Sequence, residues 1–218
     1  MFNKIYIKLL SLLINFIDSN NKKKITNFFK KNLNDNPINI LDIGAHTGET
    51  ISLFCNNFSI NKILAFEANP YTFAKLEKII NRREYSDKIK LFNCGLGEKK
   101  EKKNLTILNE SSSSTFNKIN KETNYYNRKE KFLSIFKAKS NIIKREILIE
   151  ILPLSDFQEL NNLKKIDILK IDTEGYELEV LKGLGQEISR IEFIYFEHHY
   201  DNMLKKNYKY PDIHDYLK

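Results

Sequence analysis

An acidic residue and two glycines close the apolar run at 38–43, the first of five strand-like runs, in Leu41-Asp42-Ile43-Gly44-Ala45-His46-Thr47-Gly48. Glycines at this Gly-x-x-x-Gly spacing permit a tight turn and leave room for a ligand against the backbone. The segment lacks the Gly-x-Gly-x-x-Gly pattern that holds a pyrophosphate at a helix amino terminus in dinucleotide enzymes. It therefore favours a ligand without a pyrophosphate, and a purely structural strand-to-helix turn is the alternative.

A single carboxylate, Glu67, ends the next apolar run and precedes Ala68-Asn69-Pro70. In a doubly wound sheet, a carboxylate at this position lies beside the first turn and can accept hydrogen bonds from both hydroxyls of a ribose. Glu67 therefore predicts a nucleoside-containing ligand. Asn93 and Gly95 end the third run and are expected near an adenine edge, whereas Cys94 is expected to be a small core residue.

Charged side chains also end the fourth apolar run, in Leu169-Lys170-Ile171-Asp172-Thr173-Glu174-Gly175. Lys170 and Asp172 point to the same face of a strand, because strand residues alternate between faces. Charges so close to a buried strand are costly unless they are paired or used in chemistry. Two interpretations stay open: Asp172 and Glu174 act on a substrate, or Lys170 forms a structural salt bridge with one of them.

A general base would come from Asp172, Glu174, His198 or His199. The two histidines follow the fifth apolar run, and we favour His198, since only one of two successive residues need reach the site. Asp172, Glu174 and Glu197 with a histidine could also hold a divalent metal. The spacing of a dedicated metal site is lacking, so no metal is predicted.

The elements that position these residues alternate between strands and helices. Strand-like apolar runs occupy residues 38–43, 62–66, 89–93, 166–171 and 191–196, and helical spacing occupies 50–58, 71–81 and 176–184. Continuous apolar strands separated by helices indicate a parallel sheet that is buried on both faces. A doubly wound, Rossmann-like α/β sheet is therefore predicted. In the last helix, Glu177 and Glu179 are expected in solvent.

Between residues 97 and 154 the alternation lapses. Extended stretches are expected at 104–108 and 142–152, with a polar serine loop at 111–114 between them. The stretch at 117–140, rich in Lys, Asn and Tyr, is either an active-site cover or a surface excursion. Ser155 and Gln158 have capping-box spacing, which predicts a short helix from Asp156.

Residues 1–36 are predicted to form a helical extension of one domain at 37–218. The apolar run at 5–17 is shorter than the roughly twenty residues that span a bilayer, so a docked helix is expected, with peripheral membrane contact as the alternative. A second helix is predicted at 25–33. The net charge of +8 comes from scattered lysines and favours a solvated surface over a nucleic-acid partner. The two cysteines show no disulfide framework, so a cytoplasmic setting is expected.

Taken together, these motifs resemble the FkbM family of S-adenosylmethionine-dependent methyltransferases. The resemblance spans residues 38 to about 200 and rests on the Asp42–Gly48 and Glu67–Pro70 segments, Leu154-Ser155-Asp156-Phe157, and the specific signature within 166–183. It implies a class I methyltransferase domain that transfers a methyl group to a hydroxyl of a sugar, glycan or secondary metabolite. It also implies that Asp172 and Glu174 lie near the transferred methyl. The residues predicted to contact the cofactor are Asp42, Gly44, Ala45, His46, Thr47, Gly48, Glu67, Ala68, Asn69, Asn93 and Gly95.

Two departures from the family pattern bear on these expectations. The serine segment at 111–114 lacks the usual glycine, and the chain stops at Lys218, where family members continue into an antiparallel strand pair. The sheet is therefore expected to lack its last strands.

Three rival function classes are a nicotinamide oxidoreductase, a non-catalytic nucleoside-binding protein and a metal hydrolase. The glycine spacing speaks against the first, and the last would need neither Glu67 nor the Gly44 turn. The oligomeric state is not predicted.

Overall fold

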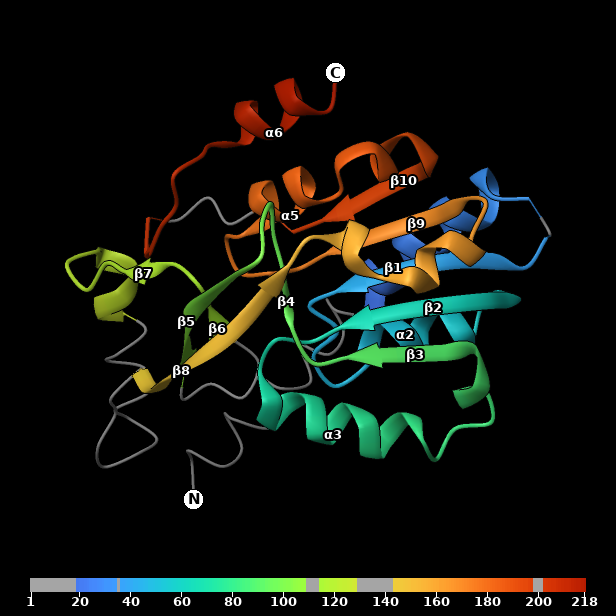
Figure 1. Ribbon diagram of the computed structural model, residues 1–218, viewed down its shortest axis with the longest axis horizontal. Helices are drawn as coiled ribbons and strands as arrows, with labels where there is room; N and C mark the ends of the chain where they lie inside the picture. Colours follow the sequence, from blue (N-terminus) through green and yellow to red (C-terminus); the bar gives the residue numbers. More distant parts are fainter. Residues whose placement is uncertain (1–18, 35, 109–113, 129–142, 198–201) are drawn as a thin grey trace.

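A five-stranded parallel sheet forms the centre of the computed structural model, which describes residues 19–34, 36–108, 114–128, 143–197 and 202–218 (Figure 1). In spatial order its strands are β10 (Ile191–Phe196), β9 (Ile166–Ile171), β1 (Ile38–Ile43), β2 (Ile60–Phe66) and β3 (Ile89–Phe92). Each neighbouring pair is parallel. The chain order reverses at β1, which is the doubly wound arrangement. The predicted fold class and all five strands are confirmed.

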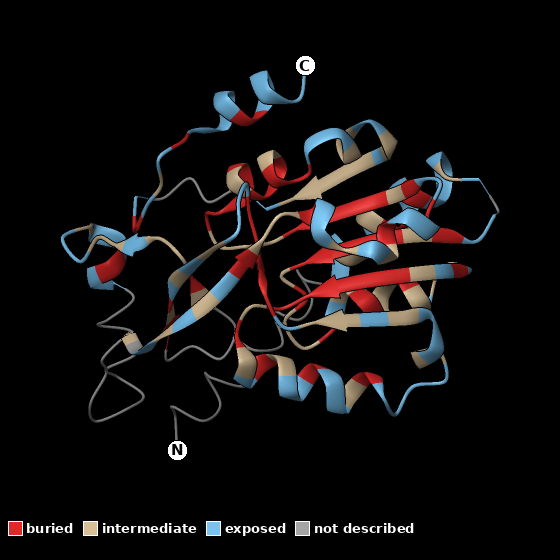
Figure 2. Ribbon diagram, in the orientation of Figure 1, coloured by how far each residue is buried: buried red, intermediate tan, exposed pale blue. Residues whose placement is uncertain are grey.

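Helices cover both faces of this sheet, because successive strand residues point to opposite cores. On one face, Ile38 and Ile40 pack with side chains from residues 19–32, which are helical, and from α2 (Glu49–Cys55) and α3 (Pro70–Ile80). On the other face, Leu41 and Ile43 pack with α5 (Glu177–Gly183). The central strands β9, β1 and β2 are consequently the most buried, whereas β3 and β10 are partly exposed (Figure 2).

A second, four-stranded sheet forms the 97–154 region beside the first one. β5 (Glu101–Leu108) and β8 (Ile143–Leu152) are a long antiparallel pair, flanked by β4 (Gly95–Leu96) and β6 (Ser114–Thr115). Both expected extended stretches are thus confirmed. Residues 109–113 and 129–142, which include most of the serine loop and much of the suggested cover, lie outside the described residues.

The carboxy-terminal segment returns to this second region. β11 (Leu204–Lys205) pairs antiparallel with β7 (Lys118–Ile119), and α6 (Tyr210–Tyr216) follows. A small apolar cluster of Leu108, Tyr126, Met203 and Leu204 joins the two segments. Within the described residues, the parallel sheet has five strands and β10 lies at one edge.

Short 3₁₀ turns complete the elements and correct one expectation. They are η1 (Ser86–Lys88), η2 (Leu154–Asp156), η3 (Gln158–Asn162) and η4 (Gly185–Arg190). The helix expected from Asp156 is absent from this described stretch, because extended Phe157 separates η2 from η3 and neither turn has a side-chain cap. Ser155 lies inside the first turn and not at a cap position, so the capping-box prediction was wrong.

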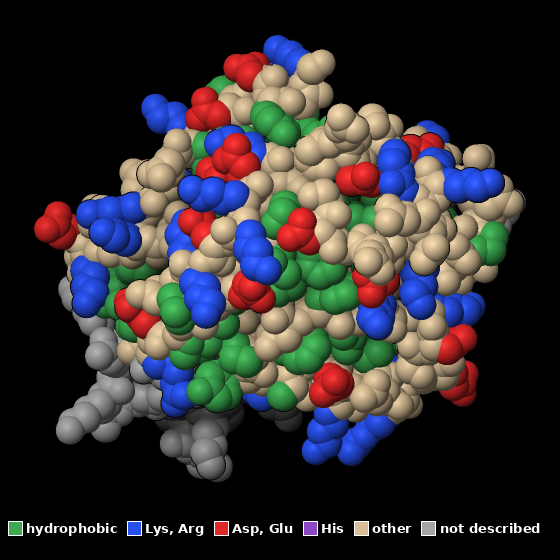
Figure 3. Space-filling view, in the orientation of Figure 1, with side chains coloured by type: hydrophobic (Ala, Val, Ile, Leu, Met, Phe, Trp, Pro, Cys, Tyr) green, Lys and Arg blue, Asp and Glu red, His purple; other side chains and the backbone are tan. Residues whose placement is uncertain are grey.

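The amino-terminal run at 5–17 lies outside the described residues. Among the helices that the structure does describe, none combines the length and the apolarity that crossing a bilayer requires. Lys and Arg side chains are interspersed with Asp and Glu over the face shown in Figure 3. Nothing here tests the predictions about nucleic acid or membrane contact, which stay predictions.

Candidate functional site

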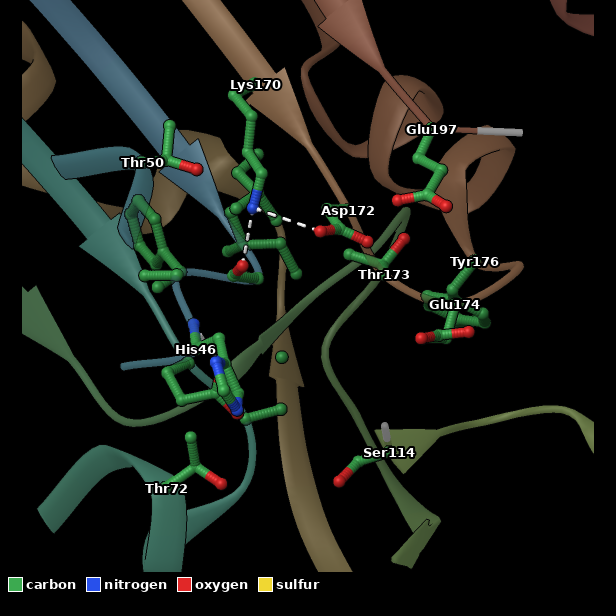
Figure 4. Close-up of a pocket in the computed structure, with 18 of the residues that line it drawn as sticks. His46, Thr50, Thr72, Ser114, Lys170, Asp172, Thr173, Glu174, Tyr176 and Glu197 are labelled. Carbon is green, nitrogen blue, oxygen red and sulfur yellow. Dashed lines mark hydrogen bonds and ion pairs between the residues drawn. The ribbon is translucent and has the colours of Figure 1, made fainter. Parts of the chain in front are cut away.

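A cavity of about 440 Å³ opens at the carboxyl edge of the parallel sheet (Figure 4). This volume lies within the range of about 300–1,000 Å³ that is usual for small-molecule sites. The predicted residues in its wall are Gly44, Ala45, His46, Glu67, Ala68, Gly95, Asp172 and Glu174. Cys94 and Glu197, which the sequence also places at strand ends, line the cavity as well. Sequence reasoning missed other lining residues, among them Lys22, Thr50, Thr72, Leu96, Leu105, Ser114, Phe116 and Tyr176.

Gly44 brings the turn after β1 against the turn after β9. Its φ of 79° is left-handed, and a Cβ at this position would lie 1.8 Å from the backbone oxygen of Asp172. Its own backbone N–H donates to the Phe66 oxygen at 2.9 Å. The ends of three strands therefore meet around a residue that must be glycine.

Gly48, which is predicted as a cofactor contact, lies where two helices pack together. A Cβ there would meet the side chains of Leu76 and Ile80, at 3.0 and 3.4 Å, so Gly48 allows α2 to pack against α3. The cavity wall does not include Gly48, nor the other predicted contacts Asp42, Thr47, Asn69 and Asn93. Contact between these five residues and a cofactor stays a prediction.

Glu67 is held rigidly at the end of β2. Its carboxylate accepts hydrogen bonds from the backbone N–H of His46 (2.9 Å) and of Asn69 (2.8 Å), one on each oxygen. Asn93 Nδ2 donates to the Glu67 backbone oxygen at 2.7 Å. Burial raises the pKa of Glu67 above its ordinary value, although the two N–H groups act in the opposite direction. Each carboxylate oxygen retains capacity to accept a further bond from a ligand.

Asn69 also shapes this corner, because it caps α3. Its side-chain oxygen accepts from the Tyr71 N–H at 3.1 Å, and Pro70 at the first helical position needs no such partner. The helix therefore starts at once after the strand end, which fixes Glu67 beside it. The His46 imidazole instead faces Glu49, at 3.2 Å, and this hydrogen bond lowers the pKa of Glu49 to about 2.

Lys170 links the two turns through a buried charge cluster. Its Nζ donates to the Gly44 backbone oxygen at 2.6 Å and lies 3.2 Å from Asp42 and 3.6 Å from Asp172. Asp42 and Lys170 are opposite each other in the β1–β9 register. Burial alone would lower the pKa of Lys170, but the two carboxylates outweigh it and raise the pKa. The salt bridge between Lys170 and Asp172 is thus present, and Asp42, which was predicted as a cofactor contact, is the closer partner.

The remaining carboxylates gather on one side of the cavity, where Asp172 and Glu197 lie together (Figure 4). Asp172 N donates to Ile43 O at 2.9 Å, and Glu197 N donates to Ile171 O at 3.2 Å, so the ends of β1, β9 and β10 are tied. The side chain of Asp172 is 38% exposed. His198 lies outside the described residues. Within the described part of the chain, no three His, Cys, Asp or Glu side chains are placed to hold a metal.

Glu177 corrects another expectation, because it is fully buried and not in solvent. Its carboxylate accepts hydrogen bonds from the turn that carries Glu174 and from Tyr208. The sequence shows only that Glu177 lies in the first turn of a helix. Acidic residues are also common there on the surface, so its burial could not be predicted.

Comparison with known proteins identifies the family. The model of the methyltransferase FkbM domain matches residues 42–218. The chain belongs to this family. Residues 1–41 precede the match, so the boundary expected at residue 37 stays a prediction.

Two curated proteins are similar to this chain. Methyltransferase 1 of Beauveria bassiana (strain ARSEF 2860) is 29% identical over 149 residues, which cover 68% of this chain and 59% of the relative. Methyltransferase sdnD of Sordaria araneosa is 32% identical over 167 residues, or 72% and 63% of the two chains. The chain therefore matches about three fifths of the length of either relative. A solved structure of an FkbM methyltransferase from Methylobacillus flagellatus KT aligns with a TM-score of 0.44 at 18% identity, covering 70% of this chain and 30% of that one.

Proposed function

We propose that this FkbM methyltransferase transfers the methyl group of S-adenosylmethionine to a hydroxyl oxygen of a sugar, a glycan or a secondary metabolite. The observation that carries the proposal is the buried Glu67 carboxylate beside the Gly44 turn, with Asp172 in the wall of the same cavity. A strand-end carboxylate suits the two hydroxyls of a ribose. The glycine turn offers close backbone approach without a pyrophosphate cradle.

The chain's own groups fit this cofactor. Glu67 would accept hydrogen bonds from the ribose hydroxyls, since its oxygens are fixed by two backbone donors. Gly44 and Ala45 would lie against the methionine part. Apolar side chains on the second sheet's side of the cavity, Leu96, Leu105 and Phe116, would pack against the flat adenine ring.

Methyl transfer needs alignment of two reactants and removal of one proton. When bound, S-adenosylmethionine supplies an electrophilic methyl group on a positively charged sulfur. Asp172 would orient the acceptor hydroxyl and accept its proton as the new oxygen–carbon bond forms and the carbon–sulfur bond breaks. Alignment contributes about 7–11 kcal/mol in favourable cases, and a positioned base contributes typically 10²- to 10⁴-fold. Glu174 and His198 remain the other candidate bases.

The acceptor would enter from a second cavity of about 570 Å³ that adjoins the first. The two cavities share Lys22, Glu49, Thr50 and Glu197 in their walls. Lys22 belongs to the helical residues 19–32, so the amino-terminal extension contributes to this entrance. Charged and hydroxyl groups in such a wall suit a polyhydroxylated acceptor better than an apolar one.

Titration of the purified protein with S-adenosylmethionine and with NAD tests the proposal. Saturable heat with the first ligand alone is expected, and binding of NAD alone would favour the oxidoreductase alternative. Incubation with candidate sugars, glycans and secondary metabolites, followed by mass spectrometry for a gained methyl group, then identifies the acceptor. Cofactor binding without transfer to any acceptor would favour the non-catalytic alternative.

Glu67→Gln is expected to weaken S-adenosylmethionine binding by about tenfold or more, because a hydrogen bond to a charged group is worth about 1.5–3 kcal/mol. Since the pKa of Glu67 is raised, protonation removes the charge already above the ordinary pH range of a glutamate. Affinity should therefore fall as the pH drops toward that raised pKa, and the Gln variant should lose this dependence. Calorimetry across pH measures both effects, with exposed Glu77→Gln as the control. Equal affinity in the two variants would remove Glu67 from the site.

A further inference from the structure

We infer that Glu177 is a positioning residue that fixes the turn carrying Asp172 and Glu174, and that Tyr208 from the carboxy-terminal segment holds Glu177 in place. The role in turnover rests on the proposed function. The role in ordering the turn does not, because it follows from contacts within the chain.

The Glu177 carboxylate is fully buried and spans the base of the turn. Its Oε1 accepts from the Gly175 backbone N–H at 2.9 Å and from the Thr173 hydroxyl at 3.2 Å, with the Thr173 N–H at 3.4 Å. Its Oε2 accepts from the Tyr208 hydroxyl. A buried carboxylate is tolerated only when such donors replace water, and charge-assisted hydrogen bonds are stronger than neutral ones.

The turn requires outside support because its backbone is unusual. Glu174 and Gly175 both have left-handed φ values, 51° and 90°. This region is unfavourable for a non-glycine residue, so the conformation persists only when the surroundings enforce it. Glu177 enforces it from the side of α5.

The second sheet holds the same turn from the opposite side. Thr115 Oγ1 donates to the Glu174 backbone oxygen at 2.7 Å, and Asn117 Nδ2 donates to the Gly175 backbone oxygen at 2.6 Å. The turn's donors thus face Glu177 and its acceptors face β6 and the residues after it. Since the Asp172 backbone oxygen also adjoins Gly44, a shift of this turn would reach the proposed cofactor site as well as the acceptor side.

Tyr208 connects this support to the carboxy-terminal segment. Only 7% of the residue is exposed, and burial together with the neighbouring Glu177 raises the pKa of Tyr208. Its hydroxyl therefore stays protonated and available as a donor. The segment itself is anchored by the β11–β7 pair and by buried Ile213 in α6. The carboxy-terminal segment consequently supports the site without lining it.

Tyr208→Phe, Glu177→Gln and Glu177→Ala test the inference in the full-length chain. Tyr216→Phe is the matched control, because its hydroxyl also bonds to α5, at the Leu181 oxygen, but does not contact the turn. Glu179→Ala is the control for removing a carboxylate from the same helix, since Glu179 faces Lys182. Melting temperature, cofactor affinity, kcat and KM, and hydrogen exchange at the Thr173 and Gly175 amides are measured on every variant.

We expect Tyr208→Phe to accelerate exchange at the Gly175 amide and to lower kcat by about tenfold, with cofactor affinity changed less than about threefold. Glu177→Ala should lower kcat by about 10², and Glu177→Gln should restore part of this loss, because its amide oxygen still accepts from Gly175. Adding Asp172→Asn to Glu177→Ala should lower kcat by a further factor of less than about three, since both act through one turn.

The inference would be overturned if the Glu177 and Tyr208 variants melted at a lower temperature but kept wild-type kcat and wild-type exchange at the Thr173 and Gly175 amides. Glu177 would then be a purely structural residue. If Glu177→Ala does not fold, Tyr208→Phe and Glu177→Gln still distinguish a positioning role of Glu177 from a purely structural one. Should the wild-type protein neither bind S-adenosylmethionine nor transfer methyl, the proposed function fails. The exchange measurements then still decide whether Glu177 orders the turn.

Discussion

Asp172→Asn is expected to lower the rate of methyl transfer by about 10²-fold or more, the scale of a lost general base, while the fold and the cofactor affinity are kept. The two side chains are nearly isosteric, and the proposed ribose contact lies at another residue, Glu67. Lys170 does not depend on Asp172, because it keeps Asp42 at 3.2 Å and the Gly44 oxygen at 2.6 Å. The variant should therefore not leave a buried charge without a partner.

Asp42→Asn is the informative contrast to this variant. It removes the closer and more buried partner of Lys170, and breaking a buried ion pair costs about 3–5 kcal/mol. We expect its melting temperature to fall, whereas that of Asp172→Asn should stay near the wild-type value. Single-turnover rates, cofactor titrations and thermal unfolding are measured on the wild-type protein, Asp172→Asn and Asp42→Asn. Together they separate a catalytic role of Asp172 from a structural one. Asp172→Asn that unfolds early but methylates at the wild-type rate would assign Asp172 to structure and the base to Glu174 or His198.

The sheet was predictable because its signal is local. The strands at 38–43 and 166–171 are continuous apolar runs, as burial between two helix layers demands, and their limits match β1 and β9. Once the strand order is doubly wound, the residues after each strand must meet at one edge. Gly44, Glu67 and Asp172, which are far apart in sequence, therefore line one cavity as expected from the sequence.

Two charged residues have partners that are distant in sequence. Asp42, whose contact with the cofactor stays a prediction, is fully buried and forms an ion pair with its register neighbour Lys170. Glu177 was expected in solvent, because helical periodicity cannot show that the Thr173–Gly175 turn and Tyr208 enclose its carboxylate. Burial outweighs Lys170 at Asp42 and raises the pKa of its carboxyl, whereas the Glu177 carboxylate accepts hydrogen bonds that replace water.

The cavity wall was only partly predictable for a related reason. Leu105 and Phe116 reach the cavity because the second sheet packs against the carboxyl edge of the first one. No motif marks them, and the 97–154 region offered only its extended stretches as a signal. Gly48 shows the opposite case, since a motif position that suggests ligand approach is used for packing α2 on α3.

Gly44→Ala is expected to abolish cofactor binding and to destabilise the fold, with a larger effect than any other glycine replacement in the site. Two costs add at this position. The left-handed φ of 79° is unfavourable for a residue with a Cβ, by about 1–2 kcal/mol, and the Cβ would lie 1.8 Å from the Asp172 backbone oxygen. That oxygen cannot move alone, because the Asp172 N–H is bonded to Ile43 O. The turns after β1 and β9 would have to separate.

Gly185→Ala separates the two costs, because Gly185 also has a left-handed φ, 54°, but a Cβ there meets nothing within 4 Å. We expect Gly185→Ala to lower the free energy of unfolding by the conformational cost alone, about 1–2 kcal/mol. It should bind S-adenosylmethionine as tightly as the wild-type protein. Denaturant unfolding and calorimetric titration on both variants give the comparison. If Gly44→Ala matched Gly185→Ala in stability and in affinity, the close contact between the two turns would not organise the site. A selective loss of affinity in Gly44→Ala would instead show that cofactor binding depends on the close contact between the two turns. Lys170 stabilises that contact by donating a hydrogen bond to the Gly44 backbone oxygen.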